Sequence, residues 1–221
     1  MYVYLIIRDV VVKKTKEEAQ ETRKAILQSA LDTFYEKGYS KTTFDEIAKR
    51  IGYTKGAVYW HFRNKPDLVT ALINDYIENQ VEYINARLSV IKTIDDIILY
   101  FLHMADYILS SENTRKCAFF MLCQMEWSET LITKVKIGVD NNKLKILNNI
   151  KEALTLLQKN GDISAEINVE HITYMIMGIW SGMLGDFLSH RCPFDLKVML
   201  KESLSLIFNG LVKERVQNAN K

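Results

Sequence analysis

One short stretch of the chain gathers side chains suited to contacting a nucleic acid. It opens with Lys55, Gly56 and Ala57. In the major groove of DNA, a lysine can donate to a guanine edge, while small residues permit close approach and a methyl group can contact thymine. Tyr59 and His61 follow, and a phenol or an imidazole can donate to phosphate, which positions a protein without reading sequence. We therefore predict that these residues bind double-stranded DNA.

Two capped helices are expected to present these side chains. Thr43 and Glu46 have the spacing of a capping box, in which the threonine hydroxyl accepts from the backbone three residues on and the glutamate reaches back. The short helix that starts there stops at Gly52, and Thr54 can cap a second helix over 55–62. Two short helices about a three-residue turn are typical of a helix-turn-helix, whose second helix enters the major groove.

The residues on and next to the helix expected over 55–62 are assigned different roles according to their position. Trp60 is expected to pack toward the second domain rather than onto DNA. Thr43 and Thr54 act first as caps, although a capping residue also lies where a phosphate is well received. For Tyr59 and His61, the alternative to phosphate contact is that they are ordinary surface residues.

Hydrophobic periodicity predicts an all-α fold. Only 2 prolines and 9 glycines interrupt 221 residues, and the motif Asn64-Lys-Pro-Asp67 has the composition of a helix start. It opens a long connecting helix that could act as a lever between two domains. The longer helices are expected over 16–37, 65–88, 94–110, 115–126, 129–160, 168–189 and 195–216. We predict an N-terminal extension over 1–15, a helix-turn-helix domain over 16–63 and a C-terminal helical domain over 64–221.

Charge and cysteine content narrow the class of protein. Residues 1–68 hold 13 basic and 9 acidic residues, and the remainder holds 16 and 18. This distribution is expected of a basic domain that contacts nucleic acid, followed by a nearly neutral second domain. Chance scatter of surface charge is the alternative. Three cysteines without disulfide or CxxC spacing favour buried, reduced thiols in a cytoplasmic protein. The apolar opening segment is interrupted by Arg8 and Asp9 and is too short to span a membrane.

Enzymes are the main alternative class. The sequence contains no glycine-rich phosphate loop, no HExxH or GxSxG motif and no cluster of cysteine and histidine ligands, and its four histidines are scattered. We therefore expect no catalysis, no cofactor and no metal. A second alternative is a DNA-binding module without a small-molecule ligand, which would act as an architectural protein or under the control of a partner.

Residues 22–76 resemble the DNA-binding domain of the TetR family of repressors. The resemblance is strongest over Thr42-Thr-Phe-Asp-Glu-Ile-Ala-Lys-Arg-Ile-Gly-Tyr-Thr-Lys-Gly-Ala-Val-Tyr-Trp-His-Phe-Arg-Asn-Lys-Pro-Asp-Leu68, in which Tyr-Trp-His is most similar to the AcrR-type branch, whose members typically control multidrug efflux. The resemblance implies a three-helix head, a connecting helix, and a regulatory domain that binds a small-molecule inducer and forms a homodimer. By the family pattern, the DNA face comprises Thr43, Thr54, Lys55, Gly56, Tyr59, His61 and Lys65.

The second half of the chain resembles the same branch. The runs Met177-Gly-Ile-Trp-Ser-Gly-Met-Leu-Gly-Asp-Phe-Leu188 and Pro193-Phe-Asp-Leu196 are similar to the AcrR-type C-terminal region in order and spacing. In that architecture the last two helices pair with those of a second subunit. A face of small residues would permit close approach there: Gly178, Ser181, Gly182 and Gly185. Tight packing inside one subunit is the alternative.

Adaptable and aromatic side chains are concentrated in the helices expected at 94–110 and 115–126. Such residues can line a forgiving apolar cavity for a lipophilic inducer or can form an ordinary core. His103 and Glu126 could serve as its polar anchors. The candidate ligand contacts are Phe101, Met104, Phe119, Phe120, Cys123, Trp127, Met177 and Trp180. Ligand entry is expected to shift the far end of the connecting helix and to change the separation of two recognition helices in a dimer.

Overall fold

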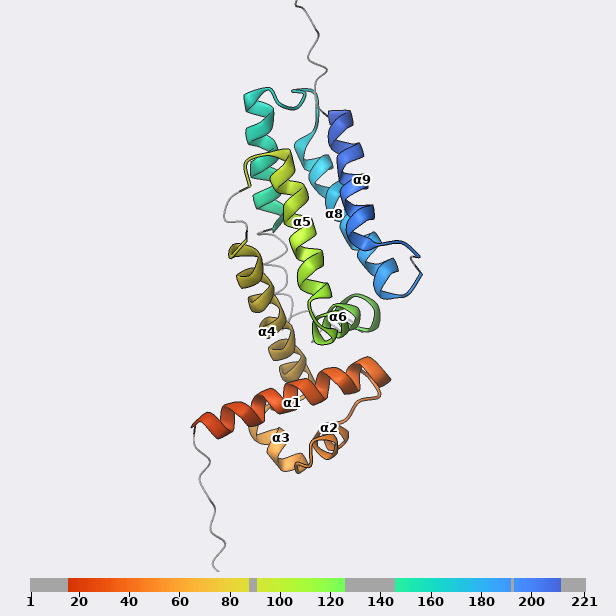
Figure 1. Ribbon diagram of the computed structural model, residues 1–221. Coiled ribbons are helices and arrows are strands. Elements are labelled where there is room, and N and C mark those ends of the chain that lie inside the picture. The colour runs from red at the N-terminus through yellow and green to blue at the C-terminus, as the bar shows by residue number, and fades with distance from the viewer. Residues whose placement is uncertain (1–15, 88–90, 126–145, 192, 212–221) are drawn as a thin grey trace, which may run out of the picture.

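A computed structural model describes residues 16–87, 91–125, 146–191 and 193–211, and these are almost entirely helical (Figure 1). The helices are α1 (Lys16–Lys37), α2 (Phe44–Arg50), α3 (Lys55–His61), α4 (Lys65–Asn85), α5 (Ile94–Leu109), α6 (Glu112–Phe119), the π-helical turn η1 (Phe120–Gln124), a helical segment over 146–160, α8 (Val169–Leu188) and α9 (Leu196–Leu211). Figure 1 shows α1 lying across α2 and α3 at one end, with the other long helices stacked above them. The expected all-α fold is confirmed.

The caps expected at the helix starts are present in the head, the name used here for α1, α2 and α3. The Thr43 hydroxyl accepts from the Glu46 backbone at 3.3 Å, and the Glu46 carboxylate accepts from the Thr43 backbone at 3.0 Å. The Thr54 hydroxyl accepts from the backbone of Ala57 at 3.2 Å. Gly52, between these two helices, adopts a φ of +70°, which favours glycine. These local interactions explain why α2 and α3 begin and separate where they do.

The helix expected at 115–126 differs in the structure. It starts three residues earlier, because the Ser111 hydroxyl accepts from the Thr114 backbone at 3.1 Å and the Thr114 hydroxyl accepts from the Ser111 backbone at 3.2 Å. It also changes to a π-helical turn from Phe120. The connecting helix α4 ends at Asn85 rather than at 88. The expected extension over 1–15 and the first part of the helix at 129–160 lie outside the described residues.

Buried apolar side chains form two clusters. The first combines the inner faces of α1, α2 and α3 with the start of α4 and with Cys117, Phe120 and Met125. The second lies among α5, α8, α9 and the helical segment over 146–160. The Phe34 and Phe120 rings stack in the first cluster, with centroids 5.0 Å apart. The core of the head is therefore completed by residues from later helices.

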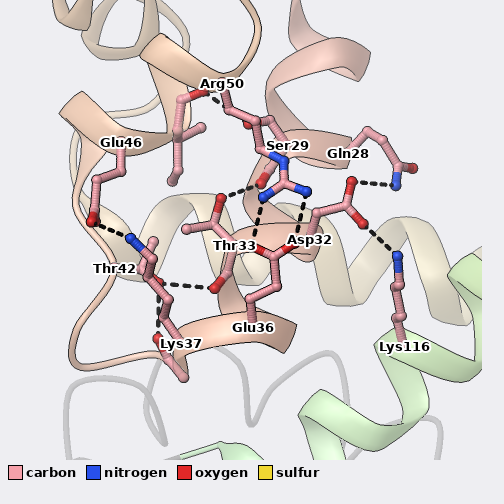
Figure 2. Close-up of polar contacts among 12 residues, drawn as sticks. Gln28, Ser29, Asp32, Thr33, Glu36, Lys37, Thr42, Glu46, Arg50 and Lys116 are labelled. Carbon is pink, nitrogen blue, oxygen red and sulfur yellow. Dashed lines mark hydrogen bonds and ion pairs between the residues drawn. The ribbon is translucent and has the colours of Figure 1, made fainter.

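A polar network along α1 ties the head together and joins it to α6 (Figure 2). On one side, the Arg50 guanidinium of α2 donates to both Glu36 carboxylate oxygens, at 2.7 and 2.8 Å. On the other, the Lys116 ammonium of α6 donates to the Asp32 carboxylate at 2.8 Å. Burial alone would raise the pKa of Asp32, but hydrogen bonds from Lys116 and Gln28 outweigh it and lower that pKa. Through its carboxylates, α1 is therefore tied to α2 inside the head and to α6 outside it.

Candidate functional site

One face of α3 is anchored and the opposite face is free. Val58 is fully buried and Phe62, one turn later, is almost so. At 100° per residue, the positions between them face outward. Lys55 and Gly56 are exposed at the start of the helix, and Ala57 is partly buried. The first turn of α3 therefore presents a charged and a small residue to the exterior.

Gly56 has no internal reason to be glycine. A Cβ built on it would meet its nearest atom, the Thr54 hydroxyl oxygen, at 3.7 Å, which is an ordinary contact. Its φ lies outside the left-handed region, so an L-residue would not be strained there. Glycine is a poorer helix former than alanine, so the described contacts of Gly56 do not favour glycine at this position.

The three aromatic residues at the end of α3 occupy different environments. The Tyr59 side chain is 52% exposed, and its ring packs edge-on against Phe44 with centroids 5.0 Å apart. Trp60 is 73% exposed, so the expectation that it packs toward the second domain is wrong. The reason is helical phase: Trp60 lies two residues after the buried Val58, almost opposite it. His61 is half-buried, with its ring 4.5 Å from that of Trp60.

The remaining residues expected on the DNA face already have structural partners. Thr43 and Thr54 cap α2 and α3, and both caps lie at exposed helix N-termini. The Lys65 ammonium donates to the carbonyls of Tyr39 and Ser40 at 2.8 and 3.2 Å. Lys65 therefore ties the start of α4 to the loop after α1, a role that sequence reasoning missed.

Part of the positive charge of the head is neutralised by its own carboxylates. The ion pairs are Lys37–Glu46, Lys49–Asp45 and Arg50–Glu36. Among the residues described, no carboxylate pairs with Lys41 or Lys55, and both are exposed. Lys41 lies two residues before the α2 N-cap, Thr43, and its place beside the capping motif is the sequence signal that could have identified it. These two lysines leave positive charge near the start of each short helix.

Three of the candidate ligand contacts come together in the core of the C-terminal half. Phe101, Met104 and Trp180 are buried, and the Phe101 and Trp180 rings lie 5.7 Å apart. Met177 is partly buried and packs against the same cluster. Burial also raises the pKa of Tyr100 to about 12, so its phenol is neutral at physiological pH. This region is apolar and carries few charges.

The other ligand candidates are more dispersed. Phe119 packs against the same cluster from its edge and also against Tyr35 of α1, with ring centroids 5.4 Å apart, whereas Phe120 belongs to the first core cluster. Cys123 is exposed, which corrects the expectation of buried thiols, whereas Cys117 is buried as expected. The Cys123 sulfur lies 3.4 Å from the Ser189 hydroxyl. Glu126 and Trp127 lie outside the described residues.

His103 and its surroundings are polar. The His103 Nδ1 is buried without a hydrogen-bond partner among the described residues, 3.8 Å from the Asp106 carboxylate. Asp106 is in turn paired with Lys197 of α9 at 2.5 Å. This arrangement places His103 toward α9.

The small residues of α8 form an outward face. Gly178, Ser181 and Gly182 are exposed and Gly185 is half-buried. A Cβ built on any of the three glycines would meet no atom within 4 Å among the described residues. Packing against the part of the chain that the structure describes therefore does not explain these glycines. Exposed Tyr174 extends the same face.

The described ranges contain no group of three or more His, Cys, Asp or Glu side chains that could hold a metal ion. No helix of those ranges is both long enough and apolar enough to cross a membrane.

The chain is similar to known proteins over most of its length. The model of the bacterial regulatory proteins of the tetR family matches residues 26–72. The HTH-type transcriptional regulator AcrR of Shigella flexneri is 28% identical over 203 residues, which cover 88% of this chain and 91% of that protein.

Solved structures share the whole architecture. NalD, the secondary repressor of the MexAB-OprM multidrug efflux pump in Pseudomonas aeruginosa, superposes with a TM-score of 0.75 at 24% identity, over 90% of this chain and 100% of NalD. SmeT, the repressor of the Stenotrophomonas maltophilia efflux pump SmeDEF, has been solved with triclosan. That complex superposes with a TM-score of 0.71 at 25% identity, over 89% of this chain and 94% of SmeT.

The matched family region covers the second half of α1, α2, α3 and the start of α4, where the capped helix-turn-helix lies. The similar proteins are transcriptional regulators rather than enzymes. Residues 26–72 therefore match the DNA-binding region of the tetR family, and the chain as a whole is similar to TetR-family transcriptional regulators of the AcrR type.

Proposed function

We propose that this protein is a cytoplasmic repressor that binds operator DNA as a homodimer and is released by a small lipophilic inducer. The observation that carries the proposal is the first turn of α3, where Lys55 and Gly56 are exposed and Gly56 has no internal reason to lack a side chain. Placed in a major groove, Lys55 reads a base edge and Gly56 permits close approach, with Ala57 beside them.

Backbone contacts to DNA would surround this reading turn. Tyr59, Trp60 and His61 lie at the other end of α3, and the exposed rings of the first two suit contact with phosphate and sugar. The N-termini at Thr43 and Thr54 favour phosphate through their free backbone donors. Lys41 and Lys65 are placed to add positive charge at the edges of this surface.

Two subunits are needed for a two-fold operator. The glycine face of α8 has open space above each glycine, and Leu206 of α9 is 74% exposed. Burying this face against a second copy explains both features, because small residues allow close helix contact and an exposed leucine gains from burial. The division into a head over 16–63 and a ligand-binding and dimerisation domain over 64–221 is part of this proposal.

The inducer would enter the apolar core around Phe101, Met104 and Trp180. Similarity to SmeT, which was solved with triclosan, and to repressors of efflux pumps supports a lipophilic ligand and an efflux operon as the target. Because α4 contributes to both core clusters, a ligand that displaces it changes the separation of the two α3 helices. A coupling of about 1–3 kcal/mol is typical of such systems and weakens DNA binding roughly 5- to 150-fold.

DNA binding is tested by fluorescence anisotropy with the DNA upstream of the protein's own gene. We expect Lys55→Ala to change the preference among operator variants, and Tyr59→Phe to weaken binding to all sequences alike. If the two variants show the reverse pattern, the assignment of base and phosphate contacts is wrong. If the wild-type chain shows no preference over random DNA, it is not an operator-binding repressor.

Ligand response is tested by thermal shift with a panel of lipophilic cations, dyes and bile-salt-like compounds. A compound that stabilises the chain should also lower its affinity for DNA, since linkage is reciprocal. If none stabilises it and DNA affinity never changes, the chain is a DNA-binding protein without a small-molecule ligand.

The dimer is tested by analytical ultracentrifugation. Gly182→Leu places a bulky side chain on the exposed α8 face and should shift the protein toward monomer. Ala165→Leu adds similar bulk at an exposed site before α8 and should leave the mass unchanged. A dimer that tolerates Gly182→Leu would place the interface elsewhere.

A further inference from the structure

A cavity of about 320 Å³ lies between α6 and the C-terminal end of α8, at the edge of the apolar core of the C-terminal half, to which Leu188 belongs and against which Phe119 and Phe187 pack. Three aromatic rings line it: Tyr35 from α1, Phe119 from α6 and Phe187 from α8. Leu188 adds an apolar surface. Rings contributed by three helices suit a flat aromatic guest, because offset and edge-on contacts are both available. None of Phe101, Met104 or Trp180 is among its lining residues.

The cavity is lined by two cationic side chains and one carboxylate: Arg115, Lys116 and Glu112. The Lys116 ammonium is paired with two carboxylates, Asp32 at 2.8 Å and Glu112 at 2.9 Å. The guanidinium of Arg115 forms no ion pair or hydrogen bond with any residue that the structure describes, and the residue is exposed. This guanidinium is therefore accessible to a ligand, and a guanidinium binds a carboxylate through two parallel hydrogen bonds.

The end of α8 places His190 at the edge of the cavity. His190 has a φ of +55°, the single positive φ at a residue other than glycine in the described ranges, which is the conformation in which helices commonly end. Its backbone donates to the Phe187 carbonyl at 3.1 Å, and the Arg191 backbone donates to the Asp186 carbonyl at 2.9 Å. These bonds fix the position of the His190 backbone beside Phe187.

We propose that this cavity binds a small aromatic anion, such as an arene carboxylate, with its ring against Phe119 and Phe187 and its charge on Arg115. The site is separate from the core pocket proposed for the lipophilic inducer. The protein would then bind a second kind of small molecule, which carries a negative charge, whereas the proposed inducer is lipophilic.

The position of the cavity couples it to the head. Tyr35 belongs to α1, and Lys116 is the α6 partner of Asp32 in the network of Figure 2. Beside that ion pair, the side-chain amides of Gln28 and Asn113 exchange hydrogen bonds of 2.9 and 2.7 Å between α1 and α6. An anion bound next to Lys116 competes with Asp32 for its ammonium and loosens this contact. We therefore expect the anion to weaken DNA binding, a consequence that rests on the proposed function.

Isothermal titration calorimetry with 2-naphthoate tests the site without DNA. We expect one naphthoate to bind per chain and Arg115→Ala to weaken its binding about tenfold or more, the effect of losing a charged hydrogen bond. The neutral analogue 2-naphthalenemethanol should bind about tenfold more weakly than naphthoate to the wild type and equally to both chains. Arg87→Ala is the matched control, because Arg87 packs on the Tyr83 ring at the far end of α4.

Any of three results would overturn the site: naphthoate does not bind the wild type, the two probes bind it equally well, or Arg115→Ala binds naphthoate as tightly as the wild type does. Phe187→Ala provides a second variant with the charge intact, and it should weaken both probes.

The DNA measurement separates the two proposals. Naphthoate should lower the operator affinity of the wild type and leave that of Arg115→Ala unchanged. If naphthoate binds as expected but operator affinity stays constant, the coupling to the head is refuted. If the chain binds no operator at all, the proposed function fails, while calorimetry still decides the anion site.

Discussion

Replacing Gly56 by alanine should make the protein more stable and a weaker DNA binder. The backbone at Gly56 is compatible with alanine, and the new methyl group would have its nearest neighbour, the Thr54 hydroxyl oxygen, at 3.7 Å. The substitution removes conformational freedom from the unfolded chain and replaces glycine by a better helix former. We expect a gain in the free energy of unfolding of about 0.5–1 kcal/mol.

The loss of DNA affinity follows from the outward position of the same methyl group. If α3 lies in the major groove with Gly56 against the DNA, a methyl inserted into a close-packed contact costs about 1–3 kcal/mol. That cost corresponds to roughly 5- to 150-fold weaker binding for each head. In a dimer this free-energy cost arises at both half-sites, so the combined loss in operator affinity should exceed the loss for one head.

Two measurements on each variant check the reasoning: urea denaturation for stability and fluorescence anisotropy for operator affinity. Gly161→Ala is the control, since Gly161 has a φ of +81° and follows the helical segment over 146–160, outside the head. It should lose about 1 kcal/mol of stability and keep its DNA affinity. If Gly56→Ala binds operator as tightly as the wild type, α3 does not approach DNA at Gly56 and the central observation of the proposed function fails.

Three further outcomes are expected. Asp32→Asn should lower the free energy of unfolding by about 1 kcal/mol at neutral pH. Because the folded-state pKa of Asp32 is lowered, the carboxylate stabilises the protein fully above the ordinary pKa of 3.8, and this stabilisation is lost as the pH falls through the lowered value. The stabilities of the two chains, measured by acid unfolding, should therefore converge at low pH. A thiol reagent followed by peptide mapping should label Cys123 in the native protein but Cys117 only after unfolding, since burial raises the pKa of Cys117 to about 12. Phe120→Ala should lower the free energy of unfolding by about 3–5 kcal/mol in urea titrations, because it leaves a cavity beside Phe34.

The sequence predicted the head well because its signals are local. A capping box, an N-cap threonine and a glycine at positive φ each act over a few residues, and the structure contains all three at Thr43, Thr54 and Gly52. Local signals are less reliable at Ser111, which falls between the helices expected over 94–110 and 115–126. It is the cap that starts α6, with threonine in the position where glutamate or glutamine is usual.

Tertiary contacts account for what sequence reasoning missed. Phe120 sits in an aromatic stretch that pattern alone assigned to the ligand-binding half, yet it stacks on Phe34 of α1. The outward position of Trp60 depends on Val58 and Phe62 taking the buried face, which becomes clear only once the packing partners of α3 are known. The pairing of Lys116 with Asp32 joins residues 84 positions apart, and no periodicity reports such a contact.

The shared core of the head bears on how these regulators can be recombined by design. A reading head cut at residue 63 and joined to another body would leave behind Leu68, Ile73 and Phe120, whose side chains fill its interior. It would also lose Lys116, leaving the half-buried Asp32 carboxylate without its ion-pair partner. A working chimera therefore has to transplant α1 together with the surface of α6 that it touches, so the unit of exchange is a contact between distant segments rather than a continuous stretch of sequence.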